Sequence, residues 1–308
     1  MCKQIHFKEF LSNIEPSSST IEEVSRIQNT LRDFLKKNYE NYIDSFLSGS
    51  YAKKTCIRPT TKYPSKRDVD IVVITNFNKT DSPNDVLCQL FKIFKKTRKY
   101  SDVVLQDHSI GITMNKLKID VVPVLVDQKD DELFYIADSN SDEWYKTDPK
   151  GHIKWSTEFN SSNKGLYKPL VKIFKWWRQG KCPKTMKFPK GITLEKIIAD
   201  NIDIIADNID RSSRTIEDVL VNTMLNIVES YKDFIDRHEL PVIRDPSQKV
   251  KSNNLLYGYE FNDFSRFIEA IEKDLSVLYN DMDDFDEHGF SNESWQTILG
   301  PEFPSANT

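Results

Sequence analysis

Apolar positions in the first half of the chain switch between helical and strand spacing. A helix is predicted over residues 17–39, because Thr20 and Glu23 form a capping box and apolar residues then recur every three or four positions. A second helix is predicted over residues 83–100 on the same spacing. Short apolar or β-branched runs predict strands at residues 43–47, 69–74, 103–105, 111–114 and 117–122, with a tight turn at residues 115–116.

The strand pattern stops near residue 155. Beyond it helical spacing predominates, and helices are predicted at residues 162–178, 193–207, 215–236, 261–279 and 292–299. The expected fold class is α+β, with an α/β catalytic domain at residues 1–155 and a helical domain at residues 156–308. An N-terminal helix within residues 1–40 is expected to pack on both domains, and a cleft is expected between them.

Composition is that of a globular protein rather than a membrane or disulfide-rich one. No apolar run is long enough to span a bilayer, and no apolar segment follows the N-terminus as in a secretory signal. The four cysteines lie far apart without metal-ligand spacing, which indicates reduced thiols and no structural zinc. These features predict a cytoplasmic protein with no membrane partner.

Charge is distributed unevenly along the 308 residues, although the net charge is only −4. Residues 159–194 contain nine Lys and Arg and no acid, and several of these lysines lie beside an apolar helical stripe. This arrangement favours a surface that faces the phosphates of nucleic acid or nucleotide over a solvated polar face. Residues 268–308 contain ten acids and one lysine, which fits either a solvated surface or a region that meets a partner.

Three aspartates stand in predicted strands. Asp68 and Asp70 flank Val69 at the head of a β-branched run, so strand alternation turns both carboxylates to one face. Asp120 lies in a second apolar strand, on the face opposite Ile119. Ionised carboxylates in such strands need a counter-charge, and these three could hold two Mg²⁺ ions for phosphoryl transfer. The alternative is that Asp68 and Asp70 only begin a strand at the surface.

A Gly-Ser turn precedes the acidic strands. Gly49 and Ser50 follow the predicted strand at residues 43–47, and glycine allows a backbone to approach a phosphate closely. The Gly-x-x-x-x-Gly-Lys-Ser/Thr pattern of a P-loop is absent. A Gly-Ser dipeptide is common in proteins, so its position relative to the three acids matters more than its presence.

The order of these features resembles that of the nucleotidyltransferase superfamily of the DNA polymerase β type. Within it, the chain is most similar to the bacterial cGAS/DncV-like nucleotidyltransferases (CD-NTases), which are relatives of oligoadenylate synthase. The catalytic half carries the resemblance in LSGSYAKKTCIRP at residues 47–59, DVDIVV at residues 68–73 and KIDVVP at residues 118–123. The helical half carries it in LVKIFKWWR at residues 170–178, TLEKII at residues 193–198 and LPVIRDP at residues 240–246.

The resemblance implies a polymerase β-like α/β domain packed on a helical domain, bilobed with a central cleft. Gly49 and Ser50 would cradle the triphosphate of the donor nucleotide. Asp68, Asp70 and Asp120 would bind two Mg²⁺ ions, for which Mn²⁺ could substitute. Asp120 would also help to deprotonate the attacking ribose hydroxyl.

The resemblance also implies a lysine against the triphosphate, on the helix predicted at residues 162–178. The matching position is Lys175, and Lys172 one turn earlier is the second candidate. The alternative interpretation is that these side chains only cover the surface between the two domains.

The implied reaction is attack of a 3′ or 2′ hydroxyl of one nucleotide on the α-phosphate of a nucleoside triphosphate, with release of pyrophosphate. Related enzymes close a cyclic di- or trinucleotide that signals in CBASS anti-phage defence. ATP is the expected substrate, while the second base, the linkage and the ring size stay open.

The resemblance further implies an effector that receives the product and accessory proteins that meet the C-terminal tail. No zinc-binding insertion is visible, so no double-stranded DNA activator is expected. Two alternatives stay open. One is a transferase that extends RNA 3′ ends, which the basic residues 159–194 favour, and the other is an inactive nucleotide-sensing or interaction module.

Overall fold

Two compact units make up the computed structural model of the chain, which describes residues 2–59, 67–97, 99–114, 117–202, 215–280 and 289–305. The sheet unit comprises Pro16–Ser156 and Ser247–Lys251, and the helical unit comprises Met1–Glu15, Thr157–Pro246 and Ser252–Thr308. The short segment Ser247–Lys251 belongs to the sheet unit because Ser247 hydrogen-bonds to the buried carboxylate of Asp148.

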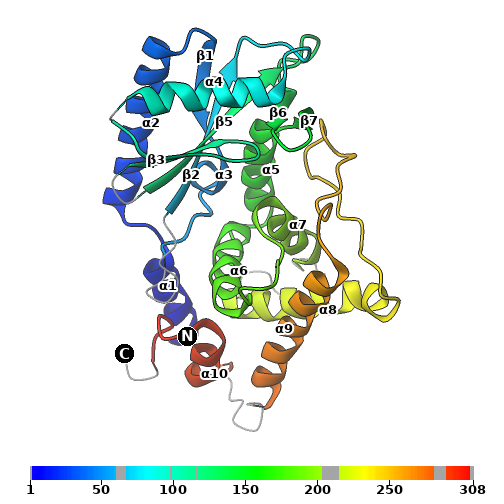
Figure 1. Cartoon of the computed structure of the whole chain (residues 1–308). Coiled ribbons are helices and arrows are strands. Elements are labelled where there is room, and N and C mark those ends of the chain that lie inside the picture. The colour runs from blue at the N-terminus through cyan, green and yellow to red at the C-terminus, as the bar shows by residue number, and fades with distance from the viewer. Residues whose placement is uncertain are drawn as a thin grey trace. The chain divides into compact units, whose positions relative to one another are not determined.

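Seven strands form one sheet in the described part of the sheet unit (Figure 1). They are β1 (Tyr42–Leu47), β2 (Arg67–Thr75), β3 (Ser101–Leu105), β4 (Ile110–Met114), β5 (Leu117–Val126), β6 (Phe134–Asp138) and β7 (Glu143–Thr147). Their order is β1-β2-β5-β4-β3, with β6 paired to β5 and β7 paired to β6. The β2–β5 pair is parallel and the other pairs are antiparallel.

The larger core of the sheet unit lies between one face of the sheet and the helices α2 (Ser18–Asn38) and α4 (Pro83–Lys96). The odd-numbered residues of β2 point into this core, because successive side chains in a strand alternate between faces. Val69, Ile71 and Val73 are each 1% exposed or less. Burial of such β-branched side chains on both strand faces explains why β2 reads as a continuous apolar run.

The even-numbered residues of β2 face the other side of the sheet. Val72 and Ile74 form a small apolar cluster there with Val124 and Phe134. Asp68 and Asp70 share this face, four and two residues before Val72 respectively. The alternation of the strand therefore places the acids beside the small cluster, on the face away from the main core.

Helices are the main regular elements among the described residues of the helical unit, and segments without helix, such as residues 182–190 and 237–246, connect them. The helices are α1 (Cys2–Ile14), α6 (Tyr167–Lys181), α7 (Gly191–Asn201), α8 (Ile216–Asp236), α9 (Phe261–Asn280) and α10 (Asn292–Leu299), while α5 (Pro149–Ser162) runs from the sheet unit into this one. Figure 1 shows α1 next to α10. Phe7 on α1 stacks edge-on against Trp295 and against Phe303, at 5.0 Å between ring centroids in each case.

Residues 1–15 thus belong with the C-terminal helices and not with the catalytic domain, to which the sequence analysis assigned them. The reason is the aromatic packing of α1, which buries Phe7 and Phe10 completely. The C-terminal residues up to Phe303 are anchored in the same way, since Trp295 and Phe303 are each 1% exposed. Among the described acids of residues 268–308, Glu269, Glu272 and Glu293 are exposed, which fits the solvated-surface alternative, whereas Asp274 is buried.

Several predicted boundaries shift in the structure. The first long helix begins one turn earlier than its predicted capping box, because the Ser17 side chain caps it by accepting from the Thr20 amide. The helix predicted at residues 162–178 corresponds to α6, which begins at Tyr167, and the helix α5 and the strands β6 and β7 were not predicted. The predicted turn at residues 115–116 and residues 203–207 of a predicted helix lie outside the described residues.

β5 continues through Pro123, where the predicted strand stopped. Pairing with β4 ends at Val121, and pairing with β6 begins at Val124. Pro123 lies between the two partners, so its missing N–H costs no hydrogen bond on that side of the strand. On the other side Pro123 keeps the parallel register with β2, opposite Val73.

None of the helices among the described residues combines the length and the apolar character that crossing a membrane requires.

Candidate active site

The parallel pairing of β2 with β5 brings the acidic residues together. In this register Asp70 lies opposite Asp120, and Asp68 lies opposite Lys118. All four residues are even-numbered and point to the same face of the sheet, because alternation is in phase across the pair. The register thus places Asp68 and Asp70 on the same sheet face as Asp120 of the neighbouring strand, as predicted.

The Gly-Ser turn closes against the same carboxylates. β1 ends at Leu47, and the five-residue helix α3 (Gly49–Lys53) begins at once, with Gly49 at φ +60°. The Ser48 amide donates to the Asp70 carbonyl oxygen at 2.8 Å, which ties the turn to β2. A Cβ atom at residue 49 would lie within 2.7 Å of Asp70 Cγ, so both the conformation and the close approach require glycine.

The carboxylates differ in their surroundings. Burial raises the pKa of Asp70 to about 6, with the charges of Asp120 and Asp68 adding to the effect and those of Lys53 and Lys118 opposing it. Asp68 is exposed. Asp120 has one buried oxygen, Oδ1, that has no hydrogen-bond partner among the described residues. An unpaired buried carboxylate oxygen is costly in a protein unless a cation or donor meets it.

The chemistry of the donors fits a hard divalent cation. Carboxylate oxygens are the ligands that Mg²⁺ prefers, and the partnerless Oδ1 of Asp120 is one such oxygen. Across the part of the chain that the structure describes, no three His, Cys, Asp or Glu side chains are arranged to hold a metal ion. The acids are neighbours, but a charged side chain of the protein itself lies between two of them.

That side chain is Lys118, whose Nζ lies 3.3 Å from Asp120 Oδ2 and 3.7 Å from Asp68 Oδ1. Neither Lys118 nor the buried Lys53 was predicted as a site residue. Lys53 lies at the end of α3 and is 6% exposed. Alternation along β5 could have indicated Lys118, because it stands two residues before Asp120 on a strand. Nothing local in the sequence indicates that Lys53 is buried.

Comparison with known proteins agrees with this arrangement. The family model of the "Second Messenger Oligonucleotide or Dinucleotide Synthetase domain" matches residues 1–160. A cyclic AMP-AMP-AMP synthase from an Acinetobacter species is 33% identical over 309 residues, spanning 99% of this chain and 86% of that protein. The chain belongs to this synthetase family.

More distant relatives agree in sequence or in fold. A cyclic AMP-AMP-GMP synthase from Enterobacter hormaechei is 26% identical, over 98% of this chain and 92% of that protein. The solved structure of the CD-NTase CdnG from Bradyrhizobium diazoefficiens, in complex with GTP, has a TM-score of 0.77 at 12% identity, covering 96% of this chain and 94% of that one. The complex of E. coli CdnC with HORMA-deltaN has a TM-score of 0.70 at 16% identity, covering 98% of both chains.

As a member of the second messenger oligonucleotide synthetase family, the protein is a nucleotidyltransferase of the cyclic oligonucleotide synthase class. Its sheet and helices match the polymerase β-like nucleotidyltransferase fold that the resemblance implied. Those predictions of fold, enzyme class and family are confirmed.

The two lysines proposed for the triphosphate lie on α6 of this synthetase, in the helical unit. Lys175 Nζ pairs with Glu195 Oε1 at 2.7 Å, and the Glu195 side chain is fully buried. Lys172 Nζ pairs with Glu15 Oε1 at 2.6 Å. A buried carboxylate needs its counter-charge, so Glu195 gives Lys175 a defined position. Nucleotide binding by these lysines remains a prediction.

The basic segment of the synthetase is therefore less available to nucleic acid than its composition suggested. Lys181, like Lys172 and Lys175, is paired with an acid: its ammonium lies 2.6 Å from the carboxylate of Asp274. Asp274 is buried and also accepts a hydrogen bond from the Trp177 indole. Three of the basic side chains thus neutralise acids of the helical unit.

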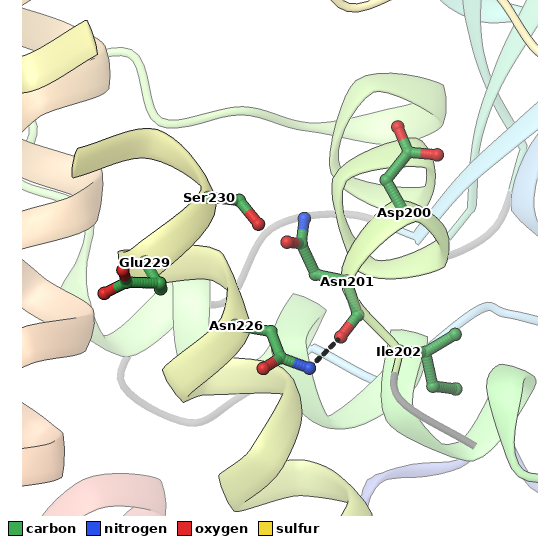
Figure 2. Close-up of a pocket in the computed structure, with 6 residues that line it drawn as sticks. All are labelled: Asp200, Asn201, Ile202, Asn226, Glu229 and Ser230. Carbon is green, nitrogen blue, oxygen red and sulfur yellow. Dashed lines mark hydrogen bonds between the residues drawn. The ribbon is translucent and has the colours of Figure 1, made fainter. Parts of the chain in front are cut away.

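The helical unit also contains a pocket (Figure 2). It is lined by Asp200, Asn201, Ile202, Asn226, Glu229 and Ser230 and has a volume of about 300 Å³. Figure 2 shows the carboxylates of Asp200 and Glu229 on opposite sides, pointing away from one another. Asp200 is ion-paired with Lys196, and Asn226 donates to the Asn201 carbonyl oxygen. The described residues that line the pocket thus bring together no groups for catalysis.

Proposed function

We propose that the protein makes its cyclic oligonucleotide with divalent ions held by Asp68, Asp70 and Asp120, Mg²⁺ first and Mn²⁺ as a substitute. The observation that carries this proposal is the cross-strand pairing of Asp70 with Asp120, beside a glycine turn that leaves no room for a side chain. Two carboxylates on facing positions, with a third two residues away, are a suitable ligand set for hard cations.

The proposed reaction joins a ribose hydroxyl oxygen to the α-phosphorus of a nucleoside triphosphate and breaks the bond to pyrophosphate. Asp120 accepts the proton of the attacking hydroxyl, for which its buried Oδ1 is suited because none of the described residues donates to it. The backbone of Gly49 and Ser50 receives the triphosphate, since the glycine allows close approach. Bound divalent ions would supply positive charge to the attacking and leaving oxygens.

The proposed substrate is ATP, and the proposed product is an adenine-containing cyclic trinucleotide. Support comes from the relatives, whose names specify cyclic AMP-AMP-AMP and cyclic AMP-AMP-GMP. We place the product in CBASS anti-phage signalling, where an effector would receive it. A HORMA protein accompanies the E. coli neighbour, which supports an accessory partner, and we propose the C-terminal tail as the place where it binds.

Incubation with Mg²⁺ and the four nucleoside triphosphates, without RNA, tests the proposal. Phosphatase-resistant product identified by mass spectrometry as a cyclic trinucleotide containing adenine is expected. A product that forms only when RNA is added would favour the RNA 3′-end alternative. That alternative rests on the basic segment, in which three lysines are engaged by acids of the same unit.

Asparagine substitutions test the metal ligands. Asp70→Asn and Asp120→Asn should each lower the rate of product formation at least about a hundredfold, because the charge is lost while the shape is kept. Asp44→Asn, on the exposed part of β1, is the matched control and should retain the wild-type rate. Circular dichroism should show the same fold in all three. Synthesis by Asp70→Asn at the control rate would show that the metal assignment is wrong.

A further inference from the structure

Lys118 occupies a place between two of the three acids. It stands on β5 two residues before Asp120 and directly opposite Asp68 on β2. Its ammonium donates to Asp120 Oδ2 at 3.3 Å and lies 3.7 Å from Asp68 Oδ1. One cationic group therefore bridges carboxylates from both strands, at the face where a divalent ion would have to bind.

The Lys118 bridge explains why three neighbouring acids are not arranged around a shared ion position. The three acids stand on neighbouring strand positions, yet within the described ranges no group of acids is set up to hold an ion. The oxygens of Asp68 and Asp120 that meet Lys118 are engaged by its ammonium, whereas Asp120 Oδ1 has no partner. A cation that took these oxygens would have to displace the ammonium.

The Lys118 side chain is able to leave. Its exposed fraction is 36%, and that of the Asp68 side chain is 60%, so one side of the bridge is open to solvent. A lysine side chain is a long flexible stem with a compact charge, which can exchange a carboxylate for another anion without moving the backbone. The triphosphate of an incoming nucleotide is such an anion.

We propose that Lys118 is a built-in competitor for the divalent ion, which keeps the nucleotide-free site from binding metal tightly. This inference rests on the proposed function of the three acids. Lys118 neutralises Asp68 and Asp120 while no nucleotide is bound, and it turns to the phosphates when metal and nucleotide enter together. Metal loading is thereby coupled to nucleotide binding, and Lys118 is a positioning residue rather than a ligand.

Binding of Mn²⁺ alone to the nucleotide-free full chain tests the inference, with free Mn²⁺ measured by electron paramagnetic resonance. Lys118→Met keeps the length of the side chain and removes its charge. Because two unit charges near a protein surface interact strongly at this distance, we expect the dissociation constant for Mn²⁺ to fall by about tenfold or more. In EDTA the melting temperature of Lys118→Met should fall, since the carboxylates lose their counter-charge, and Mn²⁺ should restore it.

Lys79→Met is the matched control. Lys79 pairs with Asp127 at 2.9 Å, beyond the opposite ends of the same two strands, so this variant loses a comparable ion pair away from the acids. It should leave Mn²⁺ binding unchanged. A dissociation constant in Lys118→Met equal to or weaker than that of the wild type would overturn the role of Lys118.

Asp120→Asn in the Lys118→Met background separates this inference from the proposed function. Loss of Mn²⁺ binding in the double variant, with tighter binding in Lys118→Met alone, supports both. Loss of binding without tightening in Lys118→Met overturns only the competitor role. Retention of tight Mn²⁺ binding in the double variant shows that the ion binds elsewhere, and both proposals are then wrong.

Discussion

Replacing Gly49 with alanine tests whether the turn is built around the Asp70 carboxylate. Gly49 has φ +60°, and this left-handed conformation costs a residue with a side chain about 1–2 kcal/mol. The new Cβ would also come within 2.7 Å of Asp70 Cγ, and overpacking of this kind typically costs about 1–3 kcal/mol. The sum of about 2–5 kcal/mol is a large fraction of the roughly 5–15 kcal/mol by which a native protein is stable.

A double-mutant cycle with Asp70→Ala separates the two contributions. Alanine at residue 70 removes the carboxylate and leaves Cβ, which lies 3.1 Å from the position that a Cβ at residue 49 would take. In that background Gly49→Ala should therefore cost mainly the backbone strain. We expect a coupling free energy of at least about 1 kcal/mol between the two positions.

Urea denaturation in EDTA, followed by circular dichroism, measures the free energies of unfolding for the cycle. Gly165→Ala is the control for backbone strain alone, because Gly165 has φ +81° and its added Cβ would meet nothing within 4 Å. Gly49→Ala should lower the free energy of unfolding more than Gly165→Ala does. It should also abolish synthesis of the cyclic product, since Asp70 must move. Equal destabilisation of both variants, with no coupling to Asp70→Ala, would refute the reasoning.

Two further predictions concern charge. The free energy of unfolding in EDTA should fall as the pH rises from about 4 to about 7, because the folded chain holds a proton on Asp70, whose pKa of about 6 lies above the ordinary value. In urea titrations at several pH values, Asp70→Asn should reduce the dependence of the free energy of unfolding on pH. An unchanged dependence would contradict the raised pKa of Asp70. In the helical unit, Lys181→Ala should cost about 1.5–3 kcal/mol by removing a charged partner from buried Asp274, whereas Ala at the exposed Lys184 should change little. Equal melting temperatures for the two lysine variants would show that the Asp274 pair contributes nothing.

Long, strongly patterned elements were predictable from the sequence. The helices α2, α8 and α9 follow from spacing alone, because each buries a continuous face. The strand β2 follows from its run of β-branched residues, which are buried on both faces. β6 and β7 were missed because each is five residues long, and only pairing with β5 gives them partners. The predicted strand ended before Pro123, whereas β5 continues beyond it. The strand tolerates this proline because pairing with β4 ends before it and pairing with β6 begins after it.

The same division holds for the site. Asp68, Asp70 and Asp120 could be chosen from their strands, and Gly49 from its place before them. Lys118 could have been indicated by its alternation with Asp120, whereas Lys53 could not, since a lysine in a sequence is ordinarily a solvated residue.

By itself, the sequence determined the family, the acids and the face of the strand on which they stand, because side-chain alternation is a local property of the backbone. Tertiary structure alone decided which positions face each other across β2 and β5, since the register arises from pairing between segments about fifty residues apart. That register sets Asp70 against Asp120 and Lys118 against Asp68. It therefore makes Lys118 a cation that bridges carboxylates of two strands, a role that depends on the register and not on either strand alone.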